Sequence, residues 1–573
     1  MKRDSQQRKT QVETMSAAAV AFTMFILLFS FATVPAQAQT PTVVYNFPAY
    51  GGDTCLPEGA LVQGRDGNMY GTGGCSPGGT NVFGGVYKIS PTGVESVIAG
   101  SPTGWAGCNS GLTVGNDGNF YGTCQSGNST NFGVIYRLTP GGAYTDLHDF
   151  TDVTGDGFPE QPPIQASDGN FYGTTGTPEL GRCGTVYQLT AAGKYKTLHA
   201  FSGGDCLSST LTQASDGNLY GTLRSCTITG SLGCVYKISL TGVFKDIYGF
   251  PQATTGSLPC TGVIQGKDGK LYGATNTGGA NGTGDLYKVA TAGGGHTVLH
   301  DFNNPTDASC VNNENANTVL LNLTQVTDGT IYGVNPAYGS IGNGGIFKLT
   351  SANVFSAFLF PNPPVEGAQP AGTLIQNTNG LVYGTTPSGG TNSYCTPGSF
   401  CQGVLFSVAT GDAAFVNLEP TQKTGFVGAS VGMFGQGFSG ASVVKFGGVA
   451  ATSVTLTGTT YLTAVVPAGA HTGTVTVTTG TTTLTSPQTY KVKAKVLNFT
   501  PTSGHVGQLV TINGTGLIQT TGVKFGAVKA TTFTVVSDSQ VTAVVPTLPL
   551  GAVTISVTTP GGTATSPTKF TVN

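Results

Sequence analysis

A six-residue phrase that recurs seven times along the chain restricts the possible folds more than any other feature of the sequence. Its commonest form is Asp-Gly-Asn-x-Tyr-Gly, and its copies begin at Asp66, Asp117, Asp168, Asp216, Asp268, Asp328 and Asn379. The tyrosines of successive copies are 51, 51, 48, 52, 60 and 51 residues apart. This period is typical of the blades of a β-propeller. Most of the chain therefore repeats one structural unit.

Further segments in each repeat have the alternation of β-strands. A Gly-x-Val-Tyr-Lys-Leu-like segment follows each phrase and contains Tyr87, Tyr136, Tyr187, Tyr236, Tyr287, Phe347 or Phe406. A third segment recurs at 147–150, 198–201, 247–250 and 299–302. Together with the apolar segment before each phrase, such as Ile164-Gln165-Ala166, these give four short strands per repeat. The sequence therefore predicts an all-β protein that begins with a seven-bladed β-propeller.

The Asp-Gly and Gly-Asn steps of the phrase favour tight turns. A two-residue hairpin turn that follows sheet twist requires positive φ angles, which Gly and Asn adopt at low cost. We therefore expect the repeated aspartates to form turns and not a ring of metal-binding or acid–base carboxylates. Three histidines also share one repeat position, and we expect them to be strand residues and not a catalytic set: His148, His199 and His300.

Residues 43–47, Val-Val-Tyr-Asn-Phe, match the third segment of a repeat but precede the first phrase. A strand from each end of the repeat region in one shared sheet would close the ring without an exposed sheet edge. We therefore expect residues 43–47 in the last blade.

The repeated phrases resemble the GloVer tandem-repeat family of bacterial exported proteins over roughly residues 43–415. The resemblance implies a surface or secreted repeat protein, and it supplies no catalytic residues to transfer. The seventh copy departs from the pattern because Asn379 replaces the aspartate.

The N-terminus has the three parts of a secretory signal. Basic residues lie between positions 2 and 9, an apolar run extends from about residue 17 to residue 31, and Ala36-Gln37-Ala38 forms a small-residue cleavage site. We expect residues 1–38 to be removed on export. An uncleaved membrane anchor is the alternative, since the run is nearly long enough to span a bilayer. We expect no membrane span in the mature chain.

All 12 cysteines lie between Cys55 and Cys401. An even number in an exported chain favours disulfides, whereas metal binding is the alternative, against which the lack of a Cys-x-x-Cys pair counts. Their positions around the phrases suggest the pairs Cys55–Cys75, Cys108–Cys124, Cys206–Cys226, Cys183–Cys234, Cys260–Cys310 and Cys395–Cys401. Sequence alone does not determine this connectivity.

A different pattern occurs twice after Leu418. Residues 420–492 and 501–572 share Gly-x-x-Gly, Gly-x-Gly, Val-Lys-Phe-Gly and Thr-Ala-Val-Val-Pro segments in the same order. Alternating Val and Thr residues predict half-buried strands, and the length of each copy suits a small sandwich. Both copies resemble the IPT/TIG immunoglobulin-like family, which implies extracellular spacer or adhesion modules. The expected domains are a propeller at 39–416 and sandwiches at 417–493 and 494–573.

Charge divides the chain in the same place. Residues 39–418 carry a formal charge of −10, and residues 419–573 carry +6. The acidic first part argues against nucleic acid as a partner. The low charged fraction of 9% and the 88 glycines also suit short strands joined by turns.

Three isolated features resemble known kinds of site. Gly428-Ala-Ser430-Val-Gly432 matches a nucleophile pattern, but Leu509 takes the place of Ser430 in the second sandwich, so we expect a strand residue. Asp152, Asp156 and Glu160 resemble a calcium loop without its spacing, so an ordinary turn is favoured. The single tryptophan, Trp105, either stacks on a sugar or packs against a disulfide.

These observations predict an exported, non-catalytic binding or adhesion protein without a cofactor or a bound metal. Its partner is expected to be a glycan or an extracellular protein. A carbohydrate-active lyase or hydrolase is the alternative, with carboxylates from non-repeated loops: Glu58, Glu160, Glu179, Glu314 and Glu366. A structural cell-surface component is a third possibility.

Overall fold

The structure is a computed structural model of the whole chain. It describes residues 40–47, 57–74, 85–102, 105, 107–108, 110–126, 131–151, 157–159, 161–176, 184–201, 210–224, 226, 228, 230–251, 256–259, 261–302, 323–336, 343–360, 367–391 and 403–573. The predicted signal at 1–38 lies outside these residues. Among the described residues, no helix has the length and apolar character needed to cross a membrane.

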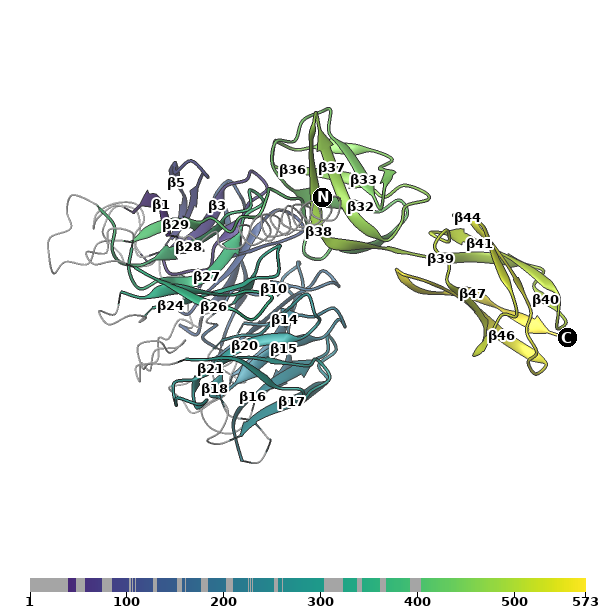
Figure 1. Cartoon of the computed structure of the whole chain (residues 1–573), viewed down its shortest axis with the longest axis horizontal. Coiled ribbons are helices and arrows are strands. Elements are labelled where there is room, and N and C mark those ends of the chain that lie inside the picture. The colour runs from purple at the N-terminus through teal and green to yellow at the C-terminus, as the bar shows by residue number, and fades with distance from the viewer. Residues whose placement is uncertain are drawn as a thin grey trace, which may run out of the picture. The chain divides into compact units, whose positions relative to one another are not determined.

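The repeat region folds into antiparallel sheets in which the strands of each repeat lie in chain order (Figure 1). The first three sheets are β2 (Val62–Gln63) to β5 (Glu95–Gly100) through β3 (Met69–Gly73) and β4 (Gly85–Ile89); β6 (Thr113–Val114), β7 (Phe120–Cys124), β8 (Val134–Leu138) and β9 (Tyr144–Asp149); and β10 (Ile164–Gln165), β11 (Phe171–Thr174), β12 (Thr185–Leu189) and β13 (Tyr195–Ala200).

The next three sheets follow the same plan, and the middle one has an additional strand, β18. They are β14 (Thr212–Gln213), β15 (Leu219–Leu223), β16 (Ser231–Ile238) and β17 (Phe244–Pro251); β18 (Ser257–Pro259), β19 (Ile264–Gln265), β20 (Leu271–Thr277), β21 (Asp285–Val289) and β22 (Thr297–Asp301); and β23 (Thr324–Gln325), β24 (Ile331–Asn335), β25 (Gly345–Leu349) and β26 (Phe355–Leu359). The prediction of four strands per repeat is thus confirmed where the structure describes the chain.

The last repeat borrows its outer strand from the beginning of the chain. Its own strands are β27 (Ala371–Gln376), β28 (Val382–Thr386) and β29 (Val404–Val408), and β1 (Thr42–Asn46) pairs with β29. Thr42 lies opposite Ser407, and Asn46 lies opposite Val404. The prediction that residues 43–47 join the last sheet is confirmed, and the shared sheet covers an edge that would otherwise be exposed.

The repeated aspartates form turns, as predicted, but the turn is longer than expected. In the first repeat Gly67 N donates to Gly64 O at 3.0 Å, and Gly64 N donates to Asn68 O at 2.9 Å. The turn therefore has three residues between the paired positions, and Gly67 carries the positive φ of 82°. Asp66 Oδ1 accepts from Asn68 N at 3.2 Å, and its Oδ2 accepts from Tyr70 Oη at 2.8 Å. The prediction of a two-residue turn is wrong.

Aromatic rings pack neighbouring sheets together. The predicted strand histidines stack on rings in the outer strand of the next repeat: His148 on Tyr195, His199 on Phe244 and His300 on Phe355, with ring centroids 3.9, 4.1 and 3.6 Å apart. Their assignment to strands is confirmed, and the stacking gives this shared repeat position a role in packing.

Removal of the Tyr187 hydroxyl is expected to raise the free energy of unfolding by up to about 1 kcal/mol. Tyr187 is fully buried, and its Oη has no hydrogen-bond partner among the described residues. Phe347 and Phe406 occupy the same position in later repeats. Urea unfolding of Tyr187→Phe tests this. The neighbouring Tyr172→Phe is the control and should be destabilised, because Tyr172 Oη donates to Asp168 Oδ2 at 2.8 Å.

Two sandwiches with the same strand order follow the repeats. The first pairs the sheet β30-β32-β36-β35 with the sheet β31-β38-β37-β33-β34, and the second pairs β39-β41-β45-β44 with β40-β47-β46-β42-β43. The bounds are β30 (Asn417–Leu418), β31 (Thr424–Phe426), β32 (Ser430–Phe434), β33 (Val443–Phe446), β34 (Val449–Ala450), β35 (Val454–Leu456), β36 (Tyr461–Val465), β37 (Gly473–Thr479), β38 (Thr482–Lys493), β39 (Lys495–Thr500), β40 (Ser503–Gly504), β41 (Leu509–Thr515), β42 (Gly522–Phe525), β43 (Val528–Lys529), β44 (Phe533–Ser537), β45 (Gln540–Val544), β46 (Gly551–Thr559) and β47 (Gly562–Val572). Each sandwich has its own apolar core.

Candidate functional site

A glutamine ends the first strand of most repeats and joins neighbouring turns. These glutamines are Gln63, Gln165, Gln213, Gln265, Gln325 and Gln376. In the fourth repeat, Gln213 Oε1 accepts from Ser167 N of the preceding turn at 2.8 Å, and its Nε2 donates to Gly217 O of its own turn at 3.0 Å. The Gln213 amide therefore joins two adjacent turns. This role was not predicted from the sequence, although the glutamine lies three residues before the first residue of the phrase in each of these repeats.

Glutamine side chains connect the turns of all neighbouring repeats, including the last and the first, except those of the first and second repeats. Thr378 N of the last repeat donates to Gln63 Oε1 at 3.2 Å. The second repeat has Val114 where the others have glutamine. There the guanidinium of Arg65 makes the connection, and its Nη2 donates to Asn116 O at 2.6 Å.

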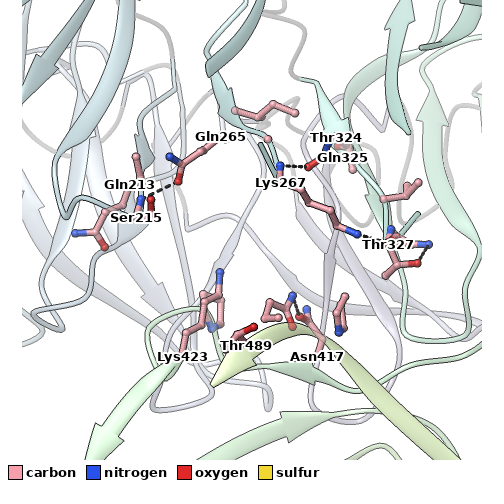
Figure 2. A pocket seen from close by; sticks show the side chains of 18 of the residues that line it. Gln213, Ser215, Gln265, Lys267, Thr324, Gln325, Thr327, Asn417, Lys423 and Thr489 are labelled. Atoms are coloured by element: carbon pink, nitrogen blue, oxygen red, sulfur yellow. Dashed lines mark hydrogen bonds between the residues drawn. The ribbon is translucent and has the colours of Figure 1, made fainter. Parts of the chain in front are cut away.

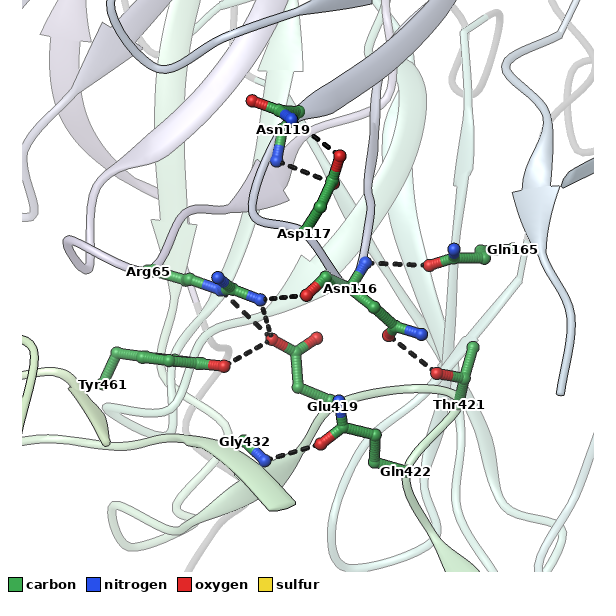
Figure 3. Close-up of polar contacts among 10 residues, drawn as sticks. All are labelled: Arg65, Asn116, Asp117, Asn119, Gln165, Glu419, Thr421, Gln422, Gly432 and Tyr461. Atoms are coloured by element: carbon green, nitrogen blue, oxygen red, sulfur yellow. Dashed lines mark hydrogen bonds and ion pairs between the residues drawn. The ribbon is translucent and has the colours of Figure 1, made fainter. Parts of the chain in front are cut away.

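The first sandwich is attached at this exceptional link (Figure 3). Arg65 Nη2 lies 2.9 Å from Glu419 Oε1, and Tyr461 Oη donates to the same oxygen at 2.9 Å. Glu419 is fully buried, and burial raises the pKa of its carboxyl, an effect that Arg65 opposes. Arg65 also lies over the Tyr461 ring, 4.5 Å from its centroid.

Further contacts of this sandwich fall on the turns of the first, second and last repeats. Thr460 Oγ1 donates to Arg65 O at 2.8 Å, and Thr421 Oγ1 donates to Asn116 Oδ1 at 2.7 Å. Gln436 Nε2 donates to Thr378 Oγ1 at 2.9 Å. The first sandwich therefore directly contacts the turns of three of the repeats.

A cavity of about 970 Å³ lies between the sandwich and the turns of the middle repeats. Figure 2 shows Lys423 and Asn417 on the sandwich side, opposite Gln213, Gln265 and Lys267 of the turns. Its size lies in the range of cavities that hold small ligands. Amide and hydroxyl side chains provide most of its polar groups.

The only charged side chains among the described residues that line the cavity are Lys267, Lys423 and Lys491. Burial lowers the pKa of Lys423. Among the described lining residues, no carboxylate balances these lysines, so protonated lysines give the cavity lining a net positive charge.

The second sandwich shows that the fold does not require the two sandwich lysines. Lys491 N donates to Lys423 O at 2.9 Å, and the equivalent bond in the second sandwich runs from Thr571 N to Thr502 O at 3.0 Å. Threonine thus replaces lysine at both positions. The backbone bond therefore forms with either residue, and the two lysines line the cavity without being required by the strand pairing.

The other candidates that the structure describes, Ser430 and Glu58, do not line this cavity. Ser430 begins β32 opposite Val465, and Leu509 begins β41 opposite Val544, so the predicted equivalence of the two strand positions is confirmed. Among the carboxylates proposed for an enzyme, Glu58 is described and does not line the cavity. The others lie outside the described residues, as do Asp152 and Asp156: Glu160, Glu179, Glu314 and Glu366.

Trp105 packs in the interior and is 5% exposed. Its ring centroid lies 5.8 Å from those of both Tyr136 and Tyr144, in a cluster that includes Cys108 and Cys124. The packing alternative is therefore confirmed, and the sugar-stacking alternative is wrong, because the buried ring offers no face to a ligand.

One of the predicted disulfides is present among the described cysteines. Cys108 and Cys124 are bonded, with their Cα atoms 4.0 Å apart. Cys226 and Cys234 are free thiols, so the structure differs from the predicted pairs that included them. The two sulfur atoms lie within 4.8 Å of each other, and a side-chain hydrogen bond with Cys234 lowers the pKa of Cys226. The remaining cysteines lie outside the described residues: Cys55, Cys75, Cys183, Cys206, Cys260, Cys310, Cys395 and Cys401.

Comparison with solved structures finds distant matches, among them two lyases. A streptogramin B lyase is 15% identical over 65% of this chain and 99% of that chain, with a TM-score of 0.44. Virginiamycin B lyase from Staphylococcus aureus is 15% identical over 64% of this chain and 98% of that chain, with a TM-score of 0.42. No curated protein matches the chain.

Comparison with family models identifies the repeats and the second sandwich. The Gloeobacter/Verrucomicrobia repeat matches residues 28–225 and 207–444, and the IPT/TIG domain matches residues 494–572. The predicted resemblance of the repeats is confirmed, and the second sandwich is an IPT/TIG domain. The chain belongs to the Gloeobacter/Verrucomicrobia repeat family and ends in an IPT/TIG domain.

Proposed function

We propose that the protein is an exported, non-catalytic binding protein whose cavity between the repeats and the first sandwich holds an acidic glycan. The observation that carries this proposal is the lining of the cavity, which combines Lys267, Lys423 and Lys491 with many neutral hydrogen-bonding groups. Uronate or sulfate groups would pair with the ammonium groups, and sugar hydroxyls would exchange hydrogen bonds with the amides.

The proposed architecture is a seven-bladed β-propeller that carries two IPT/TIG-like sandwiches. Seven copies of the phrase, the pairing of β1 with β29 and the bond from Thr378 to Gln63 all support a closed ring of this size. The identical strand order of the two sandwiches supports a common origin for both. The signal-like N-terminus supports export to the cell surface or the medium.

The absence of lining carboxylates among the described residues supports binding rather than hydrolysis at this cavity. Most glycoside hydrolases need a pair of Asp or Glu residues, one as acid and one as base or nucleophile. The two sandwiches together contain only two acidic residues, Glu419 and Asp538. Glu419 is engaged by Arg65 and Tyr461.

Replacement of Lys423 or Lys491 by alanine is expected to weaken binding of an oligogalacturonate about tenfold, since one charge-assisted hydrogen bond contributes at least about 1.5 kcal/mol. Isothermal titration of the chain from residue 39 onward measures this. Lys445→Ala is the matched control, because Lys445 is exposed on the same sandwich and does not line the cavity.

Equal binding of acidic and neutral oligosaccharides, or unchanged affinity in both cavity variants, would refute the proposal. Product analysis accompanies the titration. Shortened oligosaccharides would identify an enzyme instead, and assembly of the protein without any glycan would favour a structural role.

A further inference from the structure

A second group of reactive side chains lies in the fourth repeat, and none of them lines the cavity. Cys234 lies in β16 and is fully buried, and Asp246 lies on the neighbouring strand β17. Cys226 precedes β16 and is half-buried. The two thiol sulfurs and a carboxylate oxygen all lie within 4.8 Å of one another.

The spacing of these atoms suits a tetrahedral metal site. Zinc binds thiolate sulfur at about 2.3 Å and carboxylate oxygen at about 2.0 Å, so its ligand atoms lie roughly 3.5 to 3.8 Å apart. Cys234 Sγ is 3.4 Å from Asp246 Oδ1. Small side-chain adjustments would bring all three atoms onto one ion. A tetrahedral zinc ion takes a fourth ligand, and because Cys226 is partly exposed, water can reach the site to supply it.

Comparison with the second repeat separates the role of the carboxylate from that of the thiols. Asp146 lies opposite Tyr136 in β8 and β9, as Asp246 lies opposite Tyr236 in β16 and β17. The position of Cys234 is taken there by Val134. An acidic residue at this place is therefore compatible with a blade that has no thiol. The fourth repeat places two thiols beside this carboxylate, and a disulfide between them would not need the carboxylate.

We propose that Cys226, Cys234 and Asp246 bind one zinc ion. Binding replaces the two thiol protons, which are released to solvent, and leaves two thiolates and one carboxylate around the metal. The ion joins the segment before β16 to the sheet. This inference is independent of the proposed glycan cavity, because it concerns other residues and another ligand.

The test is native mass spectrometry of the chain from residue 39 onward, purified without reductant and incubated with zinc. One zinc ion per chain is expected. Cys226→Ser and Cys234→Ser should abolish zinc retention, and Asp246→Asn should weaken zinc binding at least tenfold. Asp146→Asn is the matched control and should bind zinc like the parent protein.

A second measurement decides the case if a cysteine variant fails to fold. Bound zinc should protect Cys226 of the unaltered chain from iodoacetamide, and removal of zinc by a chelator should abolish this protection. Failure of the parent protein to bind zinc, or equal binding by all variants, would overturn the proposal. So would peptide mapping of the zinc-treated protein that finds Cys226 bonded to Cys234 or to another cysteine.

Discussion

Replacement of Gly173 by alanine is expected to lower the free energy of unfolding of the repeat region by about 3 kcal/mol. Gly173 follows the tyrosine of the third phrase, and a Cβ atom there would lie 2.2 Å from Tyr187 Oη and 2.4 Å from its Cζ. Tyr187 is fully buried, so the ring has no free space into which it can move. The added methyl group would force the strands β11 and β12 apart.

The same close approach occurs in every copy of the phrase. A Cβ atom would come within 2.5 Å of a side-chain atom at Gly71, Gly122, Gly173, Gly221, Gly273, Gly333 and Gly384. The final glycine of the phrase is thus required by the aromatic ring on the next strand and not by a turn.

Urea unfolding followed by tryptophan fluorescence measures this effect, because the single tryptophan, Trp105, is buried within the repeats. Gly141→Ala is the control, since the nearest atom to its added Cβ is 3.9 Å away. The double variant Gly173→Ala, Tyr187→Leu should recover part of the lost stability by removing the ring. Equal unfolding midpoints for Gly173→Ala and Gly141→Ala would contradict the packing argument.

Replacement of Arg65 by alanine is expected to destabilise the attachment of the first sandwich by about 3 kcal/mol at neutral pH. The substitution leaves Glu419, which is fully buried, without its cationic partner. It also removes the bond to Asn116 O that replaces the missing glutamine link. Differential scanning calorimetry of the chain from residue 39 onward should show a lower midpoint for the transition that includes this sandwich.

The loss of stability in Arg65→Ala should depend on pH. Burial raises the pKa of Glu419, and Arg65 lowers it, so the variant raises the pKa further. A carboxyl with a raised pKa in the folded state favours folding while it is protonated, and this contribution is lost as the pH rises through the folded-state pKa. The variant should therefore recover towards the parent protein on acidification and lose stability as the pH returns to neutral.

Glu419→Gln in the Arg65→Ala background provides the control. The amide carries no charge, so the double variant should be more stable than Arg65→Ala at neutral pH and should lack the additional pH dependence. A pH-independent penalty in Arg65→Ala would show that lost packing, and not the buried charge, is responsible.

The local structure of this protein could be predicted because it depends on residues that are close in sequence. The Asp-Gly turns, the alternating strands and the two sandwich patterns each depend on short-range preferences, and sevenfold repetition made the repeat pattern unmistakable. The strand at 43–47 was predictable as well, because it matches a segment that other repeats contain.

The candidate sites depend on contacts between distant parts of the chain. Only the tertiary structure determined these contacts. Arg65 and Glu419 are 354 residues apart, and nothing in the neighbourhood of either residue indicates the other. The cavity lysines come from a repeat turn and from a sandwich whose pattern otherwise matches its neighbour. Cys226 and Cys234 were assigned to other partners because sequence spacing does not show which side chains face each other across a sheet. The sequence thus determined the strands and turns, since these follow from local backbone preferences, whereas packing between elements determined which side chains meet.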